Sequence, residues 1–438
     1  KRESNQDNHA GDTKRRSDAG KTFCNGTTIN DAREECSRGE ATECVCNARR
    51  LTRAVQRDLK ACREWILFKF TSQVWLTALL QSLAECGERF DLGVRIDAEL
   101  LPVEERTAGR RRDGRQDVAR VGQHREKQLG DAQRKGIREI PGRLEDMEME
   151  GIDGEICFPS LGLWLYALDN AEAEAASARL YNDWNNDFLG SHPNRFVRCG
   201  MLPVLDFSNT VAELEYLANK GFTAAMLPAV SPPNLPKYND EKWDVVFAKG
   251  AELGIVFVMH TGTGLESVVI ERGPGAGIIN YSNQMMDACT SVMYLVSGGV
   301  LDRNPGAKVA FIESGASWLV ALAERMDEVC EAHANFVFPK LSRKPSQIID
   351  DQVWASFQHD RACITAAAAG LPGARNVMWG SDYPHAEGTF PISRKLTEEL
   401  FAGLDVSDSV RTDILGLNGA RLFGIEPVVS TSSVLLAA

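Results

Sequence analysis

Residues 380–385 read Gly-Ser-Asp-Tyr-Pro-His and directly follow an apolar, β-prone run that begins at Val377. A buried strand that ends in a turn of small residues delivers polar side chains to a site at its carboxyl end. The groups that could do chemistry here are the carboxylate of Asp382 and the imidazole of His385, which can hold and pass a proton near neutral pH. Taken alone, this run indicates a catalytic barrel.

Two other apolar runs also end in residues with useful chemistry. His260 closes one of them and Glu313 closes another. If these runs are parallel strands of one barrel, His260, Glu313 and Asp382 point into the same mouth, with His385 just beyond. Imidazoles and carboxylates that converge in this way could bind a divalent metal, whose charge lowers the pKa of bound water or polarises a substrate oxygen. We therefore predict that these four residues are catalytic.

Each of these residues also has a plainer explanation. A single histidine at a strand end is more often structural than a metal ligand. Asp382 could instead cap a following helix, and Glu313 could cap a helix that begins before Trp318. We expect no catalytic role for the other histidines after residue 140, which are His192, His333 and His359.

The elements that position these residues alternate along the chain from about residue 137. Helices are expected at 143–148, 171–189, 208–220 and 242–253, and strands at 155–159, 196–201, 223–228, 255–260, 309–313, 353–357 and 377–380. Such alternation is typical of parallel βαβ units, so we predict an α/β fold, a (β/α)8 TIM barrel. These strands are one short of a closed barrel. The first strand is therefore expected to be missing, atypical or hidden upstream of residue 140.

The alternative fold is an open, doubly wound sheet. Its dinucleotide-binding version has no support, because no Gly-x-Gly-x-x-Gly follows the first predicted strand. The glycine-rich stretch at 273–277 lacks the Gly-Lys-Ser/Thr of a phosphate-binding loop. We expect that stretch to be a loop near the entrance of the site.

The first part of the chain differs from the rest in composition. Residues 1–140 hold 28 Lys and Arg against 23 Asp and Glu, a net charge of +5, so the other 298 residues carry −17. The apolar stretch at 65–83 contains Lys69, and a central lysine costs a membrane span about 2.5–3.5 kcal/mol on insertion scales. We predict an atypical, poorly ordered or artefactual segment at 1–136, the barrel at 137–426, and a C-terminal tail at 427–438.

The net negative charge of the whole chain favours a small-molecule substrate. Its formal charge of −12 disfavours affinity for nucleic acid or for an anionic membrane, because both depend on clustered cations. The 11 cysteines are odd in number and the sequence does not open with an apolar h-region, which indicates reduced thiols and a cytoplasmic setting. The spacing of Cys44 and Cys46 is tighter than that of structural zinc sites.

Several motifs resemble the amidohydrolase-related family. They are His-Thr-Gly at 260–262, Glu-Ser-Gly-Ala-Ser-Trp-Leu at 313–319, Arg-Met-Asp at 325–327, the run at 380–385, and Asn-Gly-Ala-Arg-Leu-Phe-Gly at 418–424. The resemblance is to the branch of metal-dependent hydrolases and decarboxylases that includes aminocarboxymuconate semialdehyde decarboxylase. It covers about residues 140–426, and the run at 380–385 is its most specific part.

The resemblance implies a (β/α)8 barrel with one divalent metal, usually zinc. In that family a His-x-His pair on the first strand, a histidine after the fifth strand and an aspartate after the eighth strand hold the metal. His260 and Asp382 match the last two positions, so they are the expected metal ligands. Members that decarboxylate often carry a histidine after strand six, where this chain has Glu313. Homodimers are common in the family, and no interface can be read from the sequence.

The front of the chain departs from the family. No His-x-His pair occurs in the sequence, and the histidines before residue 140 are His9 and His124. Two ligands hold a metal far less tightly than three or four. We hypothesise that part of residues 1–136 is not the natural N-terminus, through a shifted reading frame or a misjudged gene start. Translating the upstream DNA in the other two frames tests this, and finding no His-x-His strand in any frame would refute it.

These observations favour a metal-dependent hydrolase that acts on a small amide, ester, lactone or carboxylate through a metal-activated water. One alternative is a metal-dependent decarboxylase on the same scaffold. Another is a non-catalytic barrel that lacks the first-strand ligands. The expected partner is a small-molecule substrate, with no nucleic acid and no membrane.

Overall fold

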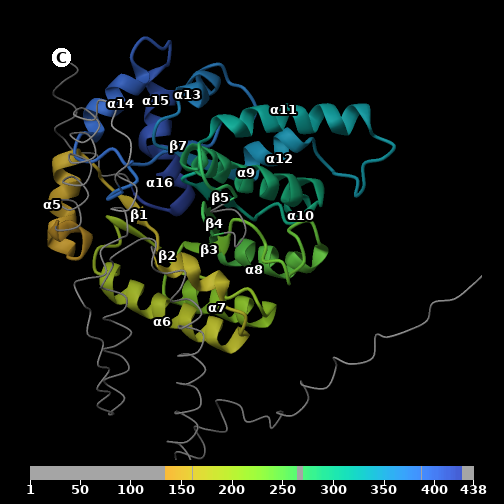
Figure 1. The fold of residues 1–438 in the computed structure, drawn as a ribbon, viewed down its shortest axis with the longest axis horizontal. Helices are drawn as coiled ribbons and strands as arrows, with labels where there is room; N and C mark the ends of the chain where they lie inside the picture. The colour runs from red at the N-terminus through yellow and green to blue at the C-terminus, as the bar shows by residue number, and fades with distance from the viewer. Residues whose placement is uncertain (1–133, 160, 264–269, 386, 427–438) are drawn as a thin grey trace, which may run out of the picture. The chain divides into compact units, whose positions relative to one another are not determined.

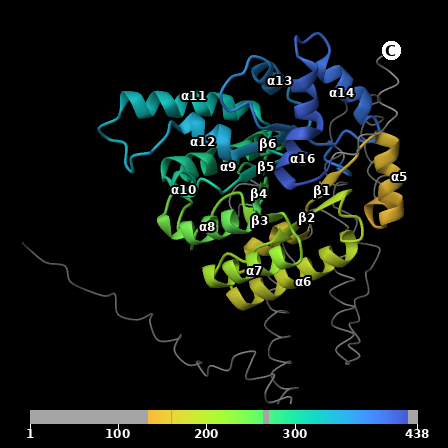
Figure 2. The ribbon, with the colours of Figure 1, turned by 180° about the vertical axis from the view of Figure 1, so that it is seen from behind.

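The structure is a computed structural model that describes residues 134–159, 161–263, 270–385 and 387–426. Within these residues, seven strands form one parallel sheet in the order of the sequence, β1 to β7. The sheet is curled, and helices lie around its outer side (Figures 1 and 2). This confirms the predicted α/β fold of the TIM-barrel class.

The strands lie close to where the sequence predicts them. Their bounds are β1 (Glu155–Cys157), β2 (Phe196–Met201), β3 (Ala224–Pro228), β4 (Val256–His260), β5 (Val309–Ile312), β6 (Val353–Phe357) and β7 (Val377–Trp379). The first is shorter than predicted and ends before Pro159, a residue that has no N–H to donate to a neighbouring strand. The predicted first barrel strand, upstream of residue 140, falls almost entirely outside the described residues.

The helices cover the outer side of the sheet. They are α5 (Ile140–Glu150), α6 (Ala171–Leu189), α7 (Phe207–Asn219), α8 (Asp244–Leu253), α9 (Ala276–Ser297), α10 (Val300–Arg303), α11 (Ser317–Ala332), α12 (Pro345–Gln352), α13 (Arg361–Ala368), α14 (Ser393–Phe401), α15 (Asp408–Thr412) and α16 (Asn418–Phe423). The predicted loop at 273–277 needs correction, because α9 already begins at Ala276. Gly275, with a φ of 79°, is its N-cap, so the turn takes up only the first part of that stretch.

The core lies between the sheet and these helices. Every residue of β3, β4 and β5 is buried, as expected for parallel strands that are covered on both faces. Close packing of α8 on β4 depends on Gly250, since a Cβ atom there would lie 2.3 Å from the ring of Phe257. The buried sheet therefore forms a rigid base for the residues at its carboxyl edge.

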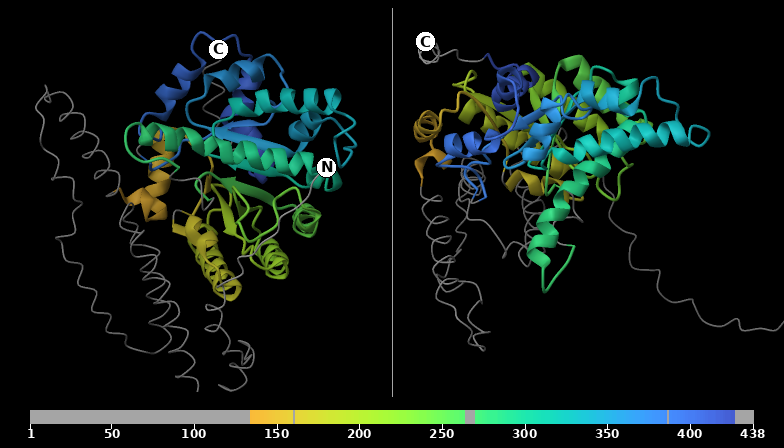
Figure 3. Two further views of the ribbon diagram at one scale, coloured as in Figure 1. Left: turned by 45° about the vertical axis from the view of Figure 1, so that its right-hand side comes forward. Right: turned by 90° about the horizontal axis from the view of Figure 1, so that it is seen from above.

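Helix α5, the orange helix in Figure 3, contacts both ends of the sheet through its side chains. Its Asp146 accepts a hydrogen bond from Tyr383, in the loop after β7, at 2.5 Å. Its Glu150 accepts a hydrogen bond from the backbone N–H of Ser393, at the start of α14, at 2.9 Å. Arg143 of the same helix forms an ion pair with Glu155 of β1. Contacts from one helix thus connect β1 with the segment that follows β7.

Several sequence predictions concern other parts of the chain. The apolar stretch at 65–83 and the tail at 427–438 lie outside the described residues, as does nearly all of the segment 1–136. Among the helices that the structure does describe, none combines the length and the apolar character needed to cross a membrane.

Candidate functional site

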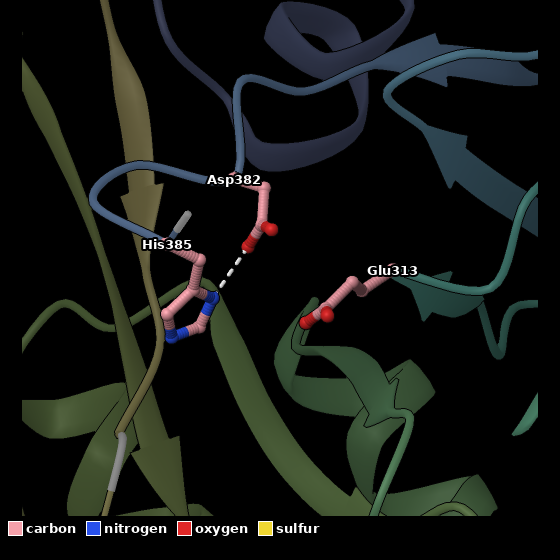
Figure 4. A group of neighbouring side chains, drawn as sticks. All are labelled: Glu313, Asp382 and His385. Carbon is pink, nitrogen blue, oxygen red and sulfur yellow. Dashed lines mark hydrogen bonds and ion pairs between the residues drawn. The ribbon is translucent and has the colours of Figure 1, made fainter. Parts of the chain in front are cut away.

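The four predicted catalytic residues come together at the carboxyl edge of the sheet. His260 is the last residue of β4, Glu313 directly follows β5, and Asp382 and His385 lie in the loop after β7. Ligand atoms of Glu313, Asp382 and His385 all lie within 4.8 Å of one another (Figure 4). His260 joins this group through its Nε2 atom, which lies 3.1 Å from Oε2 of Glu313.

Two of these residues have an unusual backbone conformation. Glu313 has a φ of 59° and Asp382 a φ of 55°, and among the described residues they are the only non-glycine residues with positive φ. Such a conformation costs about 1–3 kcal/mol and persists where the surroundings hold it in place. At Glu313, the backbone N–H donates to Ser356 Oγ at 3.1 Å, and the carbonyl accepts a hydrogen bond from Thr261 at 3.3 Å. Strain of this kind is concentrated at functional sites.

His260 is held in one orientation by its backbone neighbour. The side chain is buried, and Nδ1 donates to the carbonyl oxygen of Thr261 at 2.8 Å. Because Nδ1 carries that proton, Nε2 is the nitrogen that is presented to Glu313 and that could bind a metal. Burial lowers the pKa of His260, whereas the hydrogen bond and charge of Glu313, the carbonyl of Thr261 and the charge of Asp382 raise it, and the net direction is upward.

Asp382 uses only one of its two carboxylate oxygens. Its Oδ1 accepts a hydrogen bond from Nδ1 of His385 at 2.7 Å. Its Oδ2 is buried and has no hydrogen-bond partner among the described residues. A buried carboxylate oxygen without a partner costs free energy, and a bound cation would remove that cost.

His385 forms a carboxylate–imidazole pair with Asp382. Its side chain is 38% exposed, whereas that of Asp382 is 9% exposed. The hydrogen bond with Asp382 raises the pKa of His385 to about 9, against the effect of burial, and the charges of Glu313 and Glu387 act in the same direction. The exposed imidazole is therefore oriented by a buried carboxylate.

The structure also decides the capping alternatives. Among the described residues, the first helix after Asp382 is α14, which begins at Ser393 and has Ile392 as its N-cap, so Asp382 does not cap it. Helix α11 is capped by a different residue, Asp360, whose Oδ2 accepts hydrogen bonds from the backbone N–H groups of Ala316 at 3.0 Å and Ser317 at 2.8 Å. The capping explanations for Asp382 and Glu313 are therefore wrong.

A cavity beside Glu313 was not predicted from the sequence. It is lined by Tyr281, Gln284, Glu313, Gly315, Phe357, Gln358, His359, Asp360 and Glu387. Residues 358–360 directly follow β6, so applying the strand-end rule to that strand would have found them. No local signal marks Tyr281 and Gln284, because they lie within α9 and reach the cavity through the packing of the fold.

The match to a known family agrees with this geometry. A family model described as amidohydrolase matches residues 96–425, which is most of the chain. The chain belongs to the amidohydrolase family. The match confirms the resemblance seen in the sequence motifs, and it begins upstream of residue 137, where the barrel was predicted to start. The boundary of the predicted N-terminal segment stays a prediction.

Individual relatives of this amidohydrolase are distant. A 2-amino-3-carboxymuconate-6-semialdehyde decarboxylase from Dictyostelium discoideum is 22% identical over 292 residues, which are 65% of this chain and 76% of the relative. A 5-carboxyvanillate decarboxylase from Sphingomonas paucimobilis has a TM-score of 0.51 at 21% identity, over 65% of this chain and 82% of its own.

Two further solved structures have the same fold. An amidohydrolase from Mycobacterium avium subsp. paratuberculosis has a TM-score of 0.55 at 20% identity, over 68% of this chain and 76% of its own. A dihydroxybenzoic acid decarboxylase from Polaromonas sp. JS666, solved with bound manganese, has a TM-score of 0.51 at 18% identity, over 65% of this chain and 86% of its own.

The cluster has the donor atoms that a divalent cation needs. Glu313 and Asp382 offer carboxylate oxygens, and His260 and His385 offer ring nitrogens. Oδ2 of Asp382, which is buried and has no hydrogen-bond partner among the described residues, is an atom that a cation could bind. Carboxylate and imidazole together suit both zinc and manganese. The residues present therefore fit the metal that the family implies, although the first-strand histidine pair is absent from the sequence.

Proposed function

We propose that this amidohydrolase is a metal-dependent carboxy-lyase that removes CO2 from a small organic acid. The observation that carries the proposal is the cluster of Glu313, Asp382 and His385 at the carboxyl edge of the barrel, with His260 in contact. The relatives named above support decarboxylation as the reaction type, because three of the four are decarboxylases. Decarboxylation was the alternative in the sequence analysis, and these relatives favour it over hydrolysis.

In this proposal Asp382, His260 and Glu313 would hold the cation. Within the described part of the chain, Oδ2 of Asp382 lacks a hydrogen-bond partner. Nδ1 of His260 is bound to the carbonyl of Thr261, so Nε2, which now contacts Glu313 at 3.1 Å, is the ring nitrogen that could bind the cation after it loses its proton. Glu313 would supply a third donor atom, and with it a negative charge, in place of the neutral histidines that are missing from the first strand. When bound, a zinc or manganese ion would supply positive charge that orients the substrate and stabilises negative charge formed in the reaction.

His385 is the proposed proton donor. The bond between a substrate carbon and its carboxylate breaks, CO2 leaves, and the electron pair that stays on the carbon takes a proton from the imidazolium of His385. Asp382 accepts the Nδ1 hydrogen bond of His385 at 2.7 Å and so fixes the orientation of the ring. An exposed imidazole that a buried carboxylate orients is a common arrangement for proton transfer.

The test is an assay for CO2 with the purified full-length protein loaded with Zn2+ or Mn2+. The substrates are hydroxybenzoic acids and carboxymuconate semialdehydes, together with ester, lactone and amide analogues. We expect about one equivalent of metal per chain and release of CO2, with deuterium at the vacated carbon when the reaction runs in D2O. Hydrolysis of the esters, lactones or amides without CO2 release would overturn the proposal in favour of a hydrolase. Failure to hold metal after supplementation, with no turnover, would instead support the non-catalytic barrel.

A further inference from the structure

The cavity beside the cluster has the size of a small substrate site. Its volume is about 300 Å³, at the lower end of the range for small-molecule pockets. Glu313 belongs both to the lining of the cavity and to the metal-ligand cluster. A molecule in this cavity would therefore lie directly beside the cluster. The volume suits a single substituted ring.

One wall of the cavity suits a flat, partly apolar molecule. Phe357, the last residue of β6, is 1% exposed and closes the cavity toward the core. Tyr281 and Gln284, from the first half of α9, contribute an aromatic ring and an amide. Gln358 adds a second amide. Amides and a tyrosine can hydrogen-bond to neutral substituents of a ring.

The titratable groups that line the cavity are three carboxylates, Glu313, Asp360 and Glu387, and one imidazole, His359. Asp360 already uses its carboxylate at the N-terminus of α11. Glu387 lies in the loop after β7, and its charge also reaches His385. In the metal-loaded site the cation would offset the charge of Glu313, so Glu387 is the lining carboxylate that presents negative charge to a bound molecule. Hydroxyl or amino groups of a ligand could donate to this carboxylate, whereas a second carboxylate would meet like charge.

We infer that this cavity is the substrate subsite, and that it selects single-ring monocarboxylic acids with hydroxyl or amino substituents over dicarboxylic acids. The inference rests on the proposed function for the placement of the reacting carboxylate beside the cluster. It adds a specificity-determining residue, Glu387, which disfavours a second carboxylate on the ring. Among the acids named for the relatives, it favours the dihydroxybenzoate type over the carboxymuconate type.

Binding of two unreactive analogues tests the inference. In 2-nitroresorcinol a nitro group stands in for the reacting carboxylate, and 3,5-dihydroxy-4-nitrobenzoate differs from it by one carboxylate on the opposite side of the ring. We expect titration calorimetry on the Mn2+-loaded protein to show that the added carboxylate weakens binding by about tenfold or more. In the Glu387→Gln variant that ratio should shrink several-fold. Glu324→Gln, an exposed glutamate of α11, is the matched control and should leave the ratio unchanged.

The outcomes separate this inference from the proposed function. Equal or tighter binding of the carboxylated analogue, or an unchanged ratio in Glu387→Gln, would overturn the selection against dicarboxylates even if CO2 is released from some acid. Selective binding of 2-nitroresorcinol without CO2 release from any acid would support the subsite and overturn the carboxy-lyase. Failure of both analogues to bind the metal-loaded protein would overturn the subsite.

Discussion

At the scale of single residues, the site has two unusual features, which are strained backbone conformations and a buried carboxylate oxygen that has no hydrogen-bond partner in the described part of the chain. Glu313 and Asp382 both have positive φ, and Asp382 also buries a carboxylate oxygen without a partner. Neither feature would stabilise a purely structural turn, in which glycine or a hydrogen-bonded asparagine would cost less. Both are consistent with side chains that are held in place for a cation.

Removing either predicted metal ligand should remove the metal. Asp382→Ala and His260→Ala each delete a donor atom, so we expect metal affinity to fall by about 100-fold or more and turnover to be lost. Competition with a chelator of known affinity measures the first effect, and the CO2 assay measures the second. His333→Ala removes an exposed histidine beyond the end of α11 and serves as the control. Full metal affinity and activity in both site variants would refute the assignment.

His385→Gln should separate proton transfer from metal binding. Glutamine can keep a hydrogen bond to Asp382 but cannot deliver a proton, so kcat should fall by about 10²–10⁴-fold. The metal content should stay near that of the unchanged protein, because Asp382, His260 and Glu313 still hold the ion. Metal analysis and steady-state kinetics on the same preparation check this. Loss of metal as severe as in Asp382→Ala would show that His385 is a ligand instead.

At the scale of elements, helix α5 fixes the loop that carries Asp382 and His385. Tyr383, between them, donates its hydroxyl to Asp146 of α5 at 2.5 Å, and Asp146 is itself paired with Arg134. The guanidinium of Arg143 lies 4.1 Å from the centre of the Tyr383 ring. These contacts hold the residue next to the strained Asp382 backbone, so we assign Tyr383 as a positioning residue.

Tyr383→Phe should therefore weaken the metal site through the backbone. Loss of a hydrogen bond to a charged, buried group costs about 1.5–3 kcal/mol of stability, and we expect metal affinity to fall several-fold with it. Tyr216→Phe is a matched control, because Tyr216 also donates to an aspartate, Asp183, but between α7 and α6. Denaturant unfolding and metal titration compare the two variants. A similar loss of metal affinity in both would show that Tyr383 acts only through general stability.

Glu174 connects α6 to the end of β2 and gives the fold a pH dependence. It is fully buried, and its Oε2 accepts hydrogen bonds from the backbone N–H groups of Val204 at 2.9 Å and Leu205 at 2.8 Å. Burial raises the pKa of Glu174 from 4.5 to about 7. The folded protein thus holds this proton more tightly than the unfolded chain. The stabilisation is complete below about pH 4.5 and is lost as the pH rises to about 7.

Glu174→Gln should remove that part of the pH dependence. Glutamine resembles the protonated acid, so the variant should be more stable than the unchanged protein above pH 7, by up to about 3 kcal/mol, and similar to it near pH 4.5. Denaturant unfolding of both proteins between pH 4.5 and 8 gives the difference at each pH. A difference that does not change with pH would contradict the assignment to Glu174.

The sequence predicted the strands well because burial on both faces leaves continuous apolar runs. It predicted that His260, Glu313, Asp382 and His385 would lie close together, because parallel strands bring their carboxyl ends to one edge. Their catalytic and metal-binding roles stay predictions. It did not predict the cavity residues of α9. The first half of this helix has exposed apolar residues, and nothing in its sequence shows that it lies beside the site. The positive φ of Glu313 and Asp382 was also hidden, because these conformations depend on contacts with distant strands.

At the scale of the whole molecule, the described residues form a curled parallel sheet with one strand fewer than the eight of a closed barrel. Its β1 is the second strand of the predicted barrel, so β4, β5 and β7 correspond to strands five, six and eight, which is where His260, Glu313 and Asp382 are found. The ligands expected on the first strand do not occur in the sequence. In the proposed site the metal would be held by residues at the end of β4, directly after β5 and in the loop after β7, three segments that are far apart in the chain.

Metal binding should consequently stabilise the whole fold. A ligand at 100 times its Kd adds about 2.7 kcal/mol to the free energy of unfolding, which for a domain of this size raises Tm by roughly 4–5 °C. We expect thermal unfolding to show this rise with Mn2+, its reversal by EDTA, and its loss in Asp382→Ala but not in His333→Ala. Mn2+ is the decisive ion because it prefers oxygen ligands, whereas Zn2+ could also bind cysteine thiolates, and six of the 11 cysteines lie in the first 90 residues. An equal rise in Asp382→Ala would place the stabilising ion elsewhere, and no rise with either ion would contradict the metal centre.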